Sequence, residues 1–472
     1  SGGGGSGAIA INATPILRVN FSQSQLDPLQ QAYDGLKECV YASLVMQTRL
    51  KPYLDQIELV IDNNGLRLDV TKLNQKIADK KATDPENYLA DLLDLDRYAS
   101  GFLSGTNWNG LAGFDQVIET LPQTAGIVAL LSDFNVRTLT DGSDELDFTD
   151  NADIILAGEG NDTLYSSNGN DRLFGQGGDD RIYGGNGDDL LSGGAGNDVL
   201  IGEAGADTYI FGRGFGNDTV IEDSWLQDET NRIELLEGLT PADLRLERIF
   251  SGNGWQIDAS LRITIRDTSE TLTVKNHFNE SNRNAVDEII FADGTVWNAD
   301  NIKSLILIGE AGNEELLGFN DRNDIIQGGT GNDCLRGLSG DDVLDGGADN
   351  DLLIGGAGAD TYHFGTGEGQ DIISEGHDAG QDVLQLGSGV TPDDVTVRWT
   401  ILGDMAVTLV DGSRVTVRDQ ANPWSNEVGI EQLHFADGMV WDRATLSARA
   451  LSATLDDDTI VGGYLDDLLD GG

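Results

Sequence analysis

The chain has 472 residues and a formal net charge of −52, because 81 Asp and Glu residues stand against only 29 Lys and Arg residues. Such an acidic chain repels nucleic acids and anionic membranes, so cations are its natural partners. Its two cysteines, Cys39 and Cys334, form neither a disulfide framework nor a zinc pattern, and no apolar run approaches the roughly 18–20 residues of a membrane span.

The first part of the chain has a helical pattern. Residues 1–7, SGGGGSG, are typical of an engineered linker, and we predict an α-helical capping domain over residues 8–138. Leu36, Val40 and Leu44 recur at the spacing of one helix face. Nothing in this stretch gathers an acid, a base and a nucleophile, so we expect it to serve packing and capping.

Near residue 140 both the charge and the sequence period change. Residues 1–140 hold 11 Lys+Arg and 16 Asp+Glu, a balance of −5, whereas residues 141–472 hold 18 and 65, a balance of −47. From about residue 139, aspartate recurs at every ninth position, and an apolar or aromatic residue follows two positions after each one. The aspartates of this series are Asp144, Asp153, Asp162, Asp171, Asp180, Asp189, Asp198 and Asp207.

The nine-residue period returns twice, and a longer repeat encloses it. We define array 1 as residues 139–210, array 2 as 309–363 and array 3 as 453–472. Between them lie module 1 (211–308) and module 2 (364–452). The stretch "ADTYIFG" (206–212), which runs from array 1 into module 1, recurs as "ADTYHFG" (359–365), and "FADGTVW" of module 1 recurs as "FADGMVW" of module 2. Their alternating patterns predict antiparallel β modules. The whole is predicted to be mainly β, a solenoid with insertions, and its last array breaks off inside a repeat, as in a fragment of a longer protein.

One unit, "GGAGNDVLI" (193–201), shows the chemistry. Its glycines permit a tight turn, Asp198 directs a carboxylate into that turn, and the last three residues form a short strand. Two units make one coil of a parallel β-helix, which stacks aspartates 18 residues apart at the rung spacing of about 4.8 Å. Carboxylates at that spacing repel unless a cation lies between them. Calcium suits the site because it takes six to eight oxygen ligands, whereas magnesium demands a stricter octahedron.

These units resemble the calcium-binding nonapeptide G-G-x-G-x-D-x-U-x of the RTX (repeats-in-toxin) proteins. The modules look like the haemolysin-type calcium-binding-related modules that punctuate such arrays, and residues 40–62 resemble, more loosely, the region before the arrays of FrpC-like large secreted proteins. The resemblance implies a calcium-bound parallel β-roll and export by a type I secretion apparatus. It also implies a secreted, extracellular, toxin- or adhesin-like protein that folds on calcium outside the cell.

The resemblance further implies the calcium ligands, which are the sixth-position aspartates and the carbonyls of turn positions two and four. The aspartates are Asp153, Asp162, Asp171, Asp180, Asp189, Asp198, Asp207, Asp324, Asp333, Asp342, Asp351, Asp360, Asp458 and Asp467. The glycines are Gly158, Gly160, Gly169, Gly178, Gly185, Gly187, Gly194, Gly196, Gly329, Gly331, Gly340, Gly347, Gly356 and Gly358. The units around Asp144, Asp153 and Glu314 depart from the pattern, since the first two lack the glycine pair and the third has glutamate in place of aspartate.

Two other functions were weighed against a calcium-dependent folding and secretion segment. An enzyme is disfavoured because the chain has neither a G-x-S-x-G elbow nor an H-E-x-x-H motif, and its four histidines are scattered. Adhesion is the alternative, in which tryptophans of the β-rich modules bind a glycan or a host-surface protein. Trp297 and Trp441 occupy equivalent places in the two modules, which favours a role in the core instead.

Overall fold

The computed structural model describes residues 45–46, 48–62, 65–103, 114, 118, 125–134, 136–148, 152–222, 229–251, 258–278, 286–375, 380–400, 402–420 and 429–451. The chain divides into two compact units. The first comprises residues 1–139 together with 153–157 and 292–294, and the second comprises the remainder. Leu36, Val40 and Leu44, and all of array 3 with Asp458 and Asp467, lie outside the described residues.

The first unit is mostly helical. Its elements are α2 (Lys51–Leu54), β1 (Glu58–Asp62), β2 (Gly65–Asp69), α3 (Thr71–Thr83), α4 (Pro85–Leu103), α6 (Ala125–Asp133), β3 (Val136–Thr138) and β5 (Ile154–Leu156). Helix α4 begins at Pro85, whose fixed φ suits the first helical position. Its side chains Leu89, Leu92 and Leu93 are buried, as are Leu73 and Ile77 of α3.

One hairpin in this unit differs from the all-helical prediction. Strands β1 and β2 pair in antiparallel register, with Asp62 opposite Gly65. The sequence explains the difference, because "ELVID" is rich in β-branched residues and "NNG" between the strands supplies residues that tolerate a tight hairpin turn. A helical reading of residues 8–138 overlooked this local signal.

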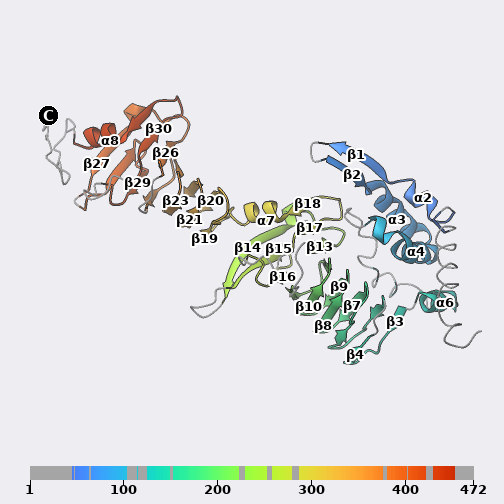
Figure 1. Cartoon of the computed structure of the whole chain (residues 1–472). Helices are drawn as coiled ribbons and strands as arrows, with labels where there is room; N and C mark the ends of the chain where they lie inside the picture. Colours follow the sequence, from blue (N-terminus) through green and yellow to red (C-terminus); the bar gives the residue numbers. More distant parts are fainter. Residues whose placement is uncertain are drawn as a thin grey trace, which may run out of the picture. The chain divides into compact units, whose positions relative to one another are not determined.

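The second unit is a parallel β-solenoid followed through both described arrays and both modules (Figure 1). The strands of array 1 and module 1 in this unit are β4 (Glu145–Asp147), β6 (Thr163–Tyr165), β7 (Arg172–Gly177), β8 (Arg181–Asn186), β9 (Leu190–Ala195), β10 (Val199–Ala204), β11 (Thr208–Phe211), β12 (Asn217–Ile221), β13 (Arg232–Leu235), β14 (Leu244–Ser251), β15 (Asp258–Ile265), β16 (Thr271–Val274), β17 (Glu288–Ile290) and β18 (Val296–Asn298). A 3₁₀ turn, η1 (Pro241–Asp243), and helix α7 (Ala299–Leu305) complete this part.

Array 2 and module 2 repeat the plan. Their strands are β19 (Glu315–Leu317), β20 (Ile325–Thr330), β21 (Cys334–Ser339), β22 (Val343–Ala348), β23 (Leu352–Ala357), β24 (Thr361–Phe364), β25 (Gln370–Ile373), β26 (Val383–Leu386), β27 (Val395–Trp399), β28 (Met405–Leu409), β29 (Arg414–Val417), β30 (Gln432–His434) and β31 (Val440–Asp442). The 3₁₀ turn η2 (Pro392–Asp394) and helix α8 (Arg443–Ala450) correspond to η1 and α7.

Within the arrays each strand pairs with the strand two places further along the chain, so array 1 with module 1 forms two sheets, and array 2 with module 2 forms two more. Val199 of β10 lies opposite Arg181 of β8, and Leu190 of β9 lies opposite Arg172 of β7, an offset of 18 residues in both sheets. In arrays 1 and 2, as far as the structure describes them, the apolar residue two positions after each aspartate is buried, except Leu146, which is 36% exposed at the start of array 1. The predicted mainly β, parallel solenoid is therefore confirmed.

The modules continue the coil as well as interrupting it. Strand β12 pairs in parallel with β10 on one side and with β16 on the other, and β13 pairs in parallel with β11 and β17. Antiparallel pairing is added at the edge by β14 and β15. Module 2 does the same with β25, β26, β29 and β30 as parallel rungs and β27–β28 as the antiparallel pair. The parallel core thus extends beyond the nonapeptides.

Candidate metal centres along the solenoid edges

The sixth-position aspartates form continuous ladders along the two edges of each array. The backbone N–H of Asp162 donates to Oδ1 of Asp180 at 2.7 Å, and that of Asp180 donates to Oδ1 of Asp198 at 2.7 Å. The opposite edge repeats the bond from Asp171 to Asp189 at 2.8 Å. Array 2 has the same bonds, as from Asp342 to Oδ1 of Asp360 at 2.8 Å. Each carboxylate therefore ties its own coil to the preceding one.

The second oxygen of most of these carboxylates is buried and has no hydrogen-bond partner. The oxygens concerned are Oδ2 of Asp162, Asp180, Asp189, Asp198, Asp207, Asp333, Asp342 and Asp351, and of Asp218 in module 1. A buried charge without a partner is costly, so a series of such oxygens at equivalent positions suits a bound positive ion. The residues present therefore fit a row of bound cations.

Glycine at the first position of the turn makes room beside this oxygen. A Cβ at Gly175 would lie 2.2 Å from Oδ2 of Asp180 and 2.6 Å from the carbonyl oxygen of Gly193 in the next coil. In array 2, a Cβ at Gly337 would lie 2.2 Å from Oδ2 of Asp342 and 2.6 Å from the carbonyl oxygen of Gly355. A carboxylate oxygen and a backbone carbonyl therefore converge in both arrays. This first-position carbonyl is a candidate ligand that the sequence analysis missed.

The glycines at positions two and four have the backbone that the turn requires. Every one of the fourteen glycines named above as candidates has a positive φ, between 90° and 152°. Ser167, Gln176 and Leu338 at position two, and Asp349 at position four, adopt positive φ without being glycine, so the turn keeps its shape in the units that depart from the pattern. The carbonyl oxygen of Gly178 lies 2.0 Å from where a Cβ of Gly196 would be, so position-four turns stack closely from coil to coil.

Burial makes these carboxyls poor anions on their own. Desolvation raises the pKa of Asp189 to about 9 and the pKa of Asp180 to about 7, although the backbone N–H of the preceding aspartate opposes the change. In array 2 the pKa of Asp342 and that of Asp351 are raised to about 6 for the same reason. A divalent cation bound against these oxygens would favour their ionised form.

The ladders continue beyond the nonapeptides, which the regular spacing did not reveal. Asp198 donates its N–H to Oδ1 of Asp218 at 3.0 Å, 20 residues on, and Asp351 does the same to Asp371. Asp207 and Asp360 donate across longer gaps, to Asn231 and Asp382, both at 2.9 Å. The sequence signal for these residues lay in the module repeat, since "DTVIE" (218–222) and "DIISE" (371–375) are offset by 153 residues.

At the end of array 2 the last nonapeptide aspartate, Asp360, comes together with two acids from outside the pattern. One carboxylate oxygen from each of Asp360, Glu375 and Asp382 lies within 4.8 Å of the others, a spacing suited to a shared cation. At the corresponding place after array 1, Glu222 is buried and its Oε1 accepts a hydrogen bond from the Tyr209 hydroxyl at 2.5 Å. There Asp207, the counterpart of Asp360, pairs with Asn231, which stands where array 2 has Asp382. The site after array 1 therefore has one carboxylate fewer.

Three aspartates of the nine-residue series have side-chain partners that the other array aspartates lack. Oδ2 of Asp144 accepts hydrogen bonds from the N–H and the hydroxyl of Thr140, at 3.0 and 2.8 Å. Asp153 and Asp324 each face an arginine, Arg137 at 3.7 Å and Arg322 at 3.1 Å. These carboxylates are therefore not equivalent to those further along the arrays.

Comparison with known protein families assigns most of this region. The RTX calcium-binding nonapeptide repeat matches residues 149–182, 183–220, 320–353 and 336–371. The haemolysin-type calcium binding protein related domain matches residues 261–301 and 407–445, in the two modules. The chain carries RTX nonapeptide repeats and these related domains, which confirms the resemblance seen in the sequence.

Individual relatives cover parts of the chain. The iron-regulated protein FrpA of Neisseria meningitidis serogroup C is 31% identical over 305 residues, which are 63% of this chain and 25% of that protein. The AlgE6R3 subunit of the Azotobacter vinelandii mannuronan C5-epimerase is 26% identical with a TM-score of 0.18, covering 23% of this chain and 72% of that one. The extracellular lipase LipA of Serratia marcescens is 18% identical with a TM-score of 0.19, covering 55% and 38%. The chain thus spans about a quarter of the length of its curated relative.

Proposed function

We propose that this chain is a calcium-dependent folding segment, in which calcium ions bind along the solenoid edges and drive the coils together, and that it has no catalytic activity of its own. The observation that carries this proposal is the series of buried aspartates with one unpartnered oxygen each. Calcium binding itself follows from the matched RTX repeats. The step proposed here is that folding depends on it.

The donor set favours calcium over other metals. Every candidate ligand is an oxygen, either a carboxylate such as Oδ2 of Asp342 or a carbonyl such as that of Gly355. Calcium accepts backbone carbonyls and irregular geometry, whereas magnesium requires a near-ideal octahedron and keeps its water. Zinc and copper prefer nitrogen and sulfur ligands, and no histidine or cysteine lies on the described ladders.

Calcium would stabilise the coils by neutralising charge that the fold concentrates. When bound, the ion supplies positive charge and extra ligand bonds between neighbouring turns. Without it, a residue such as Asp180 must be buried either as an unpaired anion or as an acid that has taken up a proton. Because the metal site exists only when two coils are stacked, its binding free energy contributes directly to folding.

We further propose that the segment belongs to a large secreted protein, toxin- or adhesin-like, exported by a type I apparatus. Low cytosolic calcium would keep the chain unfolded for export, and extracellular sites typically bind calcium at about 10⁻⁴–10⁻³ M, which would allow folding outside. The matched RTX repeats support this proposal. Among the described residues, no helix is long and apolar enough to cross a membrane.

Adhesion remains the alternative function, but two of the module tryptophans, Trp297 and Trp441, have packing contacts within the protein. Trp297 lies edge-on to Phe291 with ring centroids 4.8 Å apart, and Trp441 lies in the same way against Phe435. Arg449 also covers the Trp441 ring at 3.6 Å. These contacts account for both residues without a glycan.

The test of the proposed function is a calcium titration of the chelator-stripped chain followed by far-UV circular dichroism, with magnesium at equal ionic strength as control. We expect β-sheet signal to appear cooperatively with calcium and to return to the unfolded spectrum on chelation. A spectrum that does not respond to calcium or chelator would refute calcium-dependent folding. A glycan array probed with the calcium-loaded chain tests adhesion separately.

A further inference from the structure

The second unit of array 2 keeps the aspartate of the repeat but none of its turn glycines. It is "FNDRNDIIQ" (319–327), with Phe319 at the first position and Arg322 at the fourth. Phe319 is buried, and Asp324 is 1% exposed, as deeply buried as the aspartates of the regular units. The periodicity alone therefore groups Asp324 with the calcium ligands.

Its carboxylate, however, has a hydrogen bond on one oxygen and an arginine beside the other, although the latter oxygen accepts no hydrogen bond. The N–H of Phe319 donates to Oδ2 of Asp324 at 2.6 Å, and Nε of Arg322 forms an ion pair with Oδ1 at 3.1 Å. On the same edge one coil later, Oδ1 of Asp342 accepts the Asp324 N–H at 2.7 Å, whereas its Oδ2 is left without a partner. Both aspartates thus have one buried oxygen without a hydrogen bond, but at Asp324 that oxygen faces the Arg322 guanidinium, whereas no ion pair with a described residue is found at Oδ2 of Asp342.

Arg322 is itself held by helix α7 of module 1. Its Nη2 donates to Oγ of Ser304 at 3.1 Å, and its Nη1 lies 3.8 Å from Oδ1 of Asp300. Lys303 of the same helix pairs with Asp321 at 2.9 Å. The glycine-free turn is therefore fastened to the module by ion pairs that need no metal.

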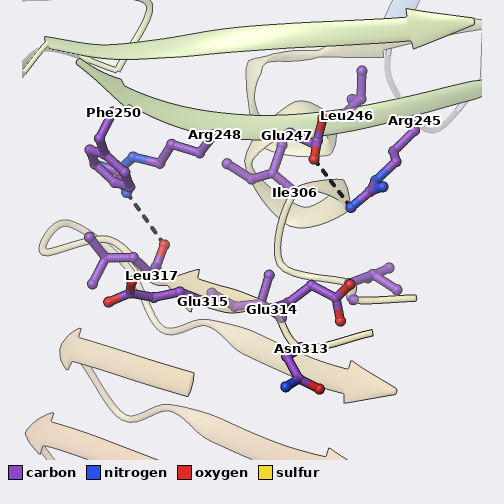
Figure 2. Close-up of a pocket in the computed structure, with 13 residues that line it drawn as sticks. Arg245, Leu246, Glu247, Arg248, Phe250, Ile306, Asn313, Glu314, Glu315 and Leu317 are labelled. Carbon is purple, nitrogen blue, oxygen red and sulfur yellow. Dashed lines mark hydrogen bonds and ion pairs between the residues drawn. The ribbon is translucent and has the colours of Figure 1, made fainter. Parts of the chain in front are cut away.

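The ring of Phe319 strengthens the same joint. It contacts two cations of module 1, with the Arg248 guanidinium 4.8 Å and the Lys303 ammonium 4.9 Å from its centroid. Arg248 also donates hydrogen bonds to the carbonyls of Leu317 and Gly318, at 3.4 and 3.1 Å, across a cavity of about 280 Å³ that Phe250 and Ile306 also line (Figure 2). In a chain of net charge −52, this concentration of cations at one turn is unusual.

Array 1 contains a related arrangement in its second nonapeptide. The unit "FTDNADIIL" (148–156) also begins with phenylalanine and lacks glycine, and its Asp153 lies 3.7 Å from Nη2 of Arg137. Side chains of residues 149–151 lie outside the described part of the chain. In both arrays, then, the glycine-free unit pairs its aspartate with an arginine.

We infer that Arg322 replaces calcium at Asp324, so that this one turn in the first coil of array 2 closes without metal and anchors the array to module 1. The ordinary calcium ladder then begins at the next coils. This inference rests on the proposed calcium-dependent folding, because it identifies one turn that folds without binding calcium.

Ion counting distinguishes the two ideas in the full-length chain. Calcium bound at saturation is measured by equilibrium dialysis and atomic absorption for the parent chain, for Asp324→Asn and for Asp342→Asn, the matched aspartate one coil along. We expect Asp324→Asn to keep the parent's ion count and Asp342→Asn to lose at least one ion. Loss of an ion in a folded Asp324→Asn chain overturns the inference, and loss in neither variant contradicts the proposed function instead.

A charge-swap cycle keeps the inference testable if Asp324→Asn does not fold. Arg322→Gln should raise the calcium concentration at half-folding by about threefold or more, because it leaves a buried carboxylate without its cation. The double variant Arg322→Gln/Asp324→Asn should recover most of that loss, and Arg336→Gln, which removes a more exposed arginine of array 2, should change little. If calcium occupied this site, Arg322→Gln would lower the midpoint by relieving repulsion, and that result would overturn the inference.

Discussion

At the scale of the residue, the array aspartate does two different things with its two oxygens. Oδ1 accepts a backbone N–H from the preceding coil, as Asp207 does from Asp189 at 2.9 Å, and so fixes the register between coils. Oδ2 is directed at the space left by the first-position glycine. An asparagine could keep the first contact but would offer a neutral oxygen to the second, so only aspartate serves both.

Replacing one such aspartate should weaken calcium binding without changing the shape of the turn. We predict that Asp189→Asn lowers calcium affinity at its sites at least about tenfold, the size of effect seen when metal-site residues are altered. Asp188→Asn is the matched control, since Asp188 is exposed in the same turn and accepts only the N–H of Ala206 through Oδ1. Isothermal titration of both variants checks this, and equal losses in the two would show that the effect is general charge, not coordination.

The raised pKa values predict how the metal-free chain responds to acid. Burial raises the pKa of Asp189 to about 9 and that of Asp371 to about 8 in the folded chain, against about 3.9 when unfolded. The folded form therefore binds more protons, so its free energy of unfolding without calcium is highest near pH 4 and falls as pH rises toward 9.

In chelator, lowering the pH from about 8 to about 5.5 should therefore increase β-sheet circular dichroism. With calcium present the direction reverses, because protons compete with the metal and the calcium midpoint should rise. Sedimentation velocity at each pH separates folding from association near the isoelectric point. Loss of β signal on acidifying the metal-free chain would contradict the linkage.

At the scale of the element, the turn depends on empty space as well as on unusual dihedrals. The φ of Gly193 is not positive, yet a Cβ on this residue would lie 2.1 Å from Oδ2 of Asp198. A side chain at this position would therefore overlap the Asp198 carboxylate and the place where a cation would bind it. Glycine is therefore favoured at position one by space alone, and at positions two and four also by the positive φ.

Gly193→Ala should therefore destabilise the calcium-loaded fold by about 1–3 kcal/mol, the usual cost of forcing a methyl group into a filled site. Gly142→Ala is the control, because its φ is also ordinary and its Cβ would meet nothing closer than Oγ1 of Thr140 at 3.9 Å. Urea unfolding at saturating calcium measures both variants. Equal stability of the two alanine variants would mean that the first-position space is not needed.

The elements that the sequence predicted are those whose signal is local and periodic. A nine-residue period determines the rung, the buried residue and the edge aspartate together, so Leu200 and Asp198 could be placed without any structure. The module rungs could not be placed in this way, because β12 and β16 pair across 54 residues and β13 and β17 across 56. The pairing of Arg322 with Asp324 could not be predicted either. The nine-residue period identifies the aspartate of a unit, but it does not show how the residues that replace its glycines are placed.

At the scale of the whole molecule, the charge of −52 opposes the compact state. The residues from 141 onward carry 18 basic against 65 acidic side chains, and the solenoid places many of those acids in rows. At 0.1 M salt the Debye length is roughly 10 Å, so interactions between exposed charges further apart than this are largely screened. Buried charges such as the ladder carboxylates are screened much less. Ionic strength alone should therefore not replace a cation that enters the ladder.

This difference can be tested by small-angle X-ray scattering of the full chain. Without calcium the chain should be expanded, with a radius of gyration approaching about 80 Å if residues 1–472 behave as an unfolded polymer. Millimolar calcium should reduce that value sharply, whereas sodium or magnesium at matched ionic strength should give only a small contraction by screening. Because screening acts on every exposed charge while coordination acts on the buried ladders, equal compaction by all three salts would show that charge neutralisation, not site binding, drives folding.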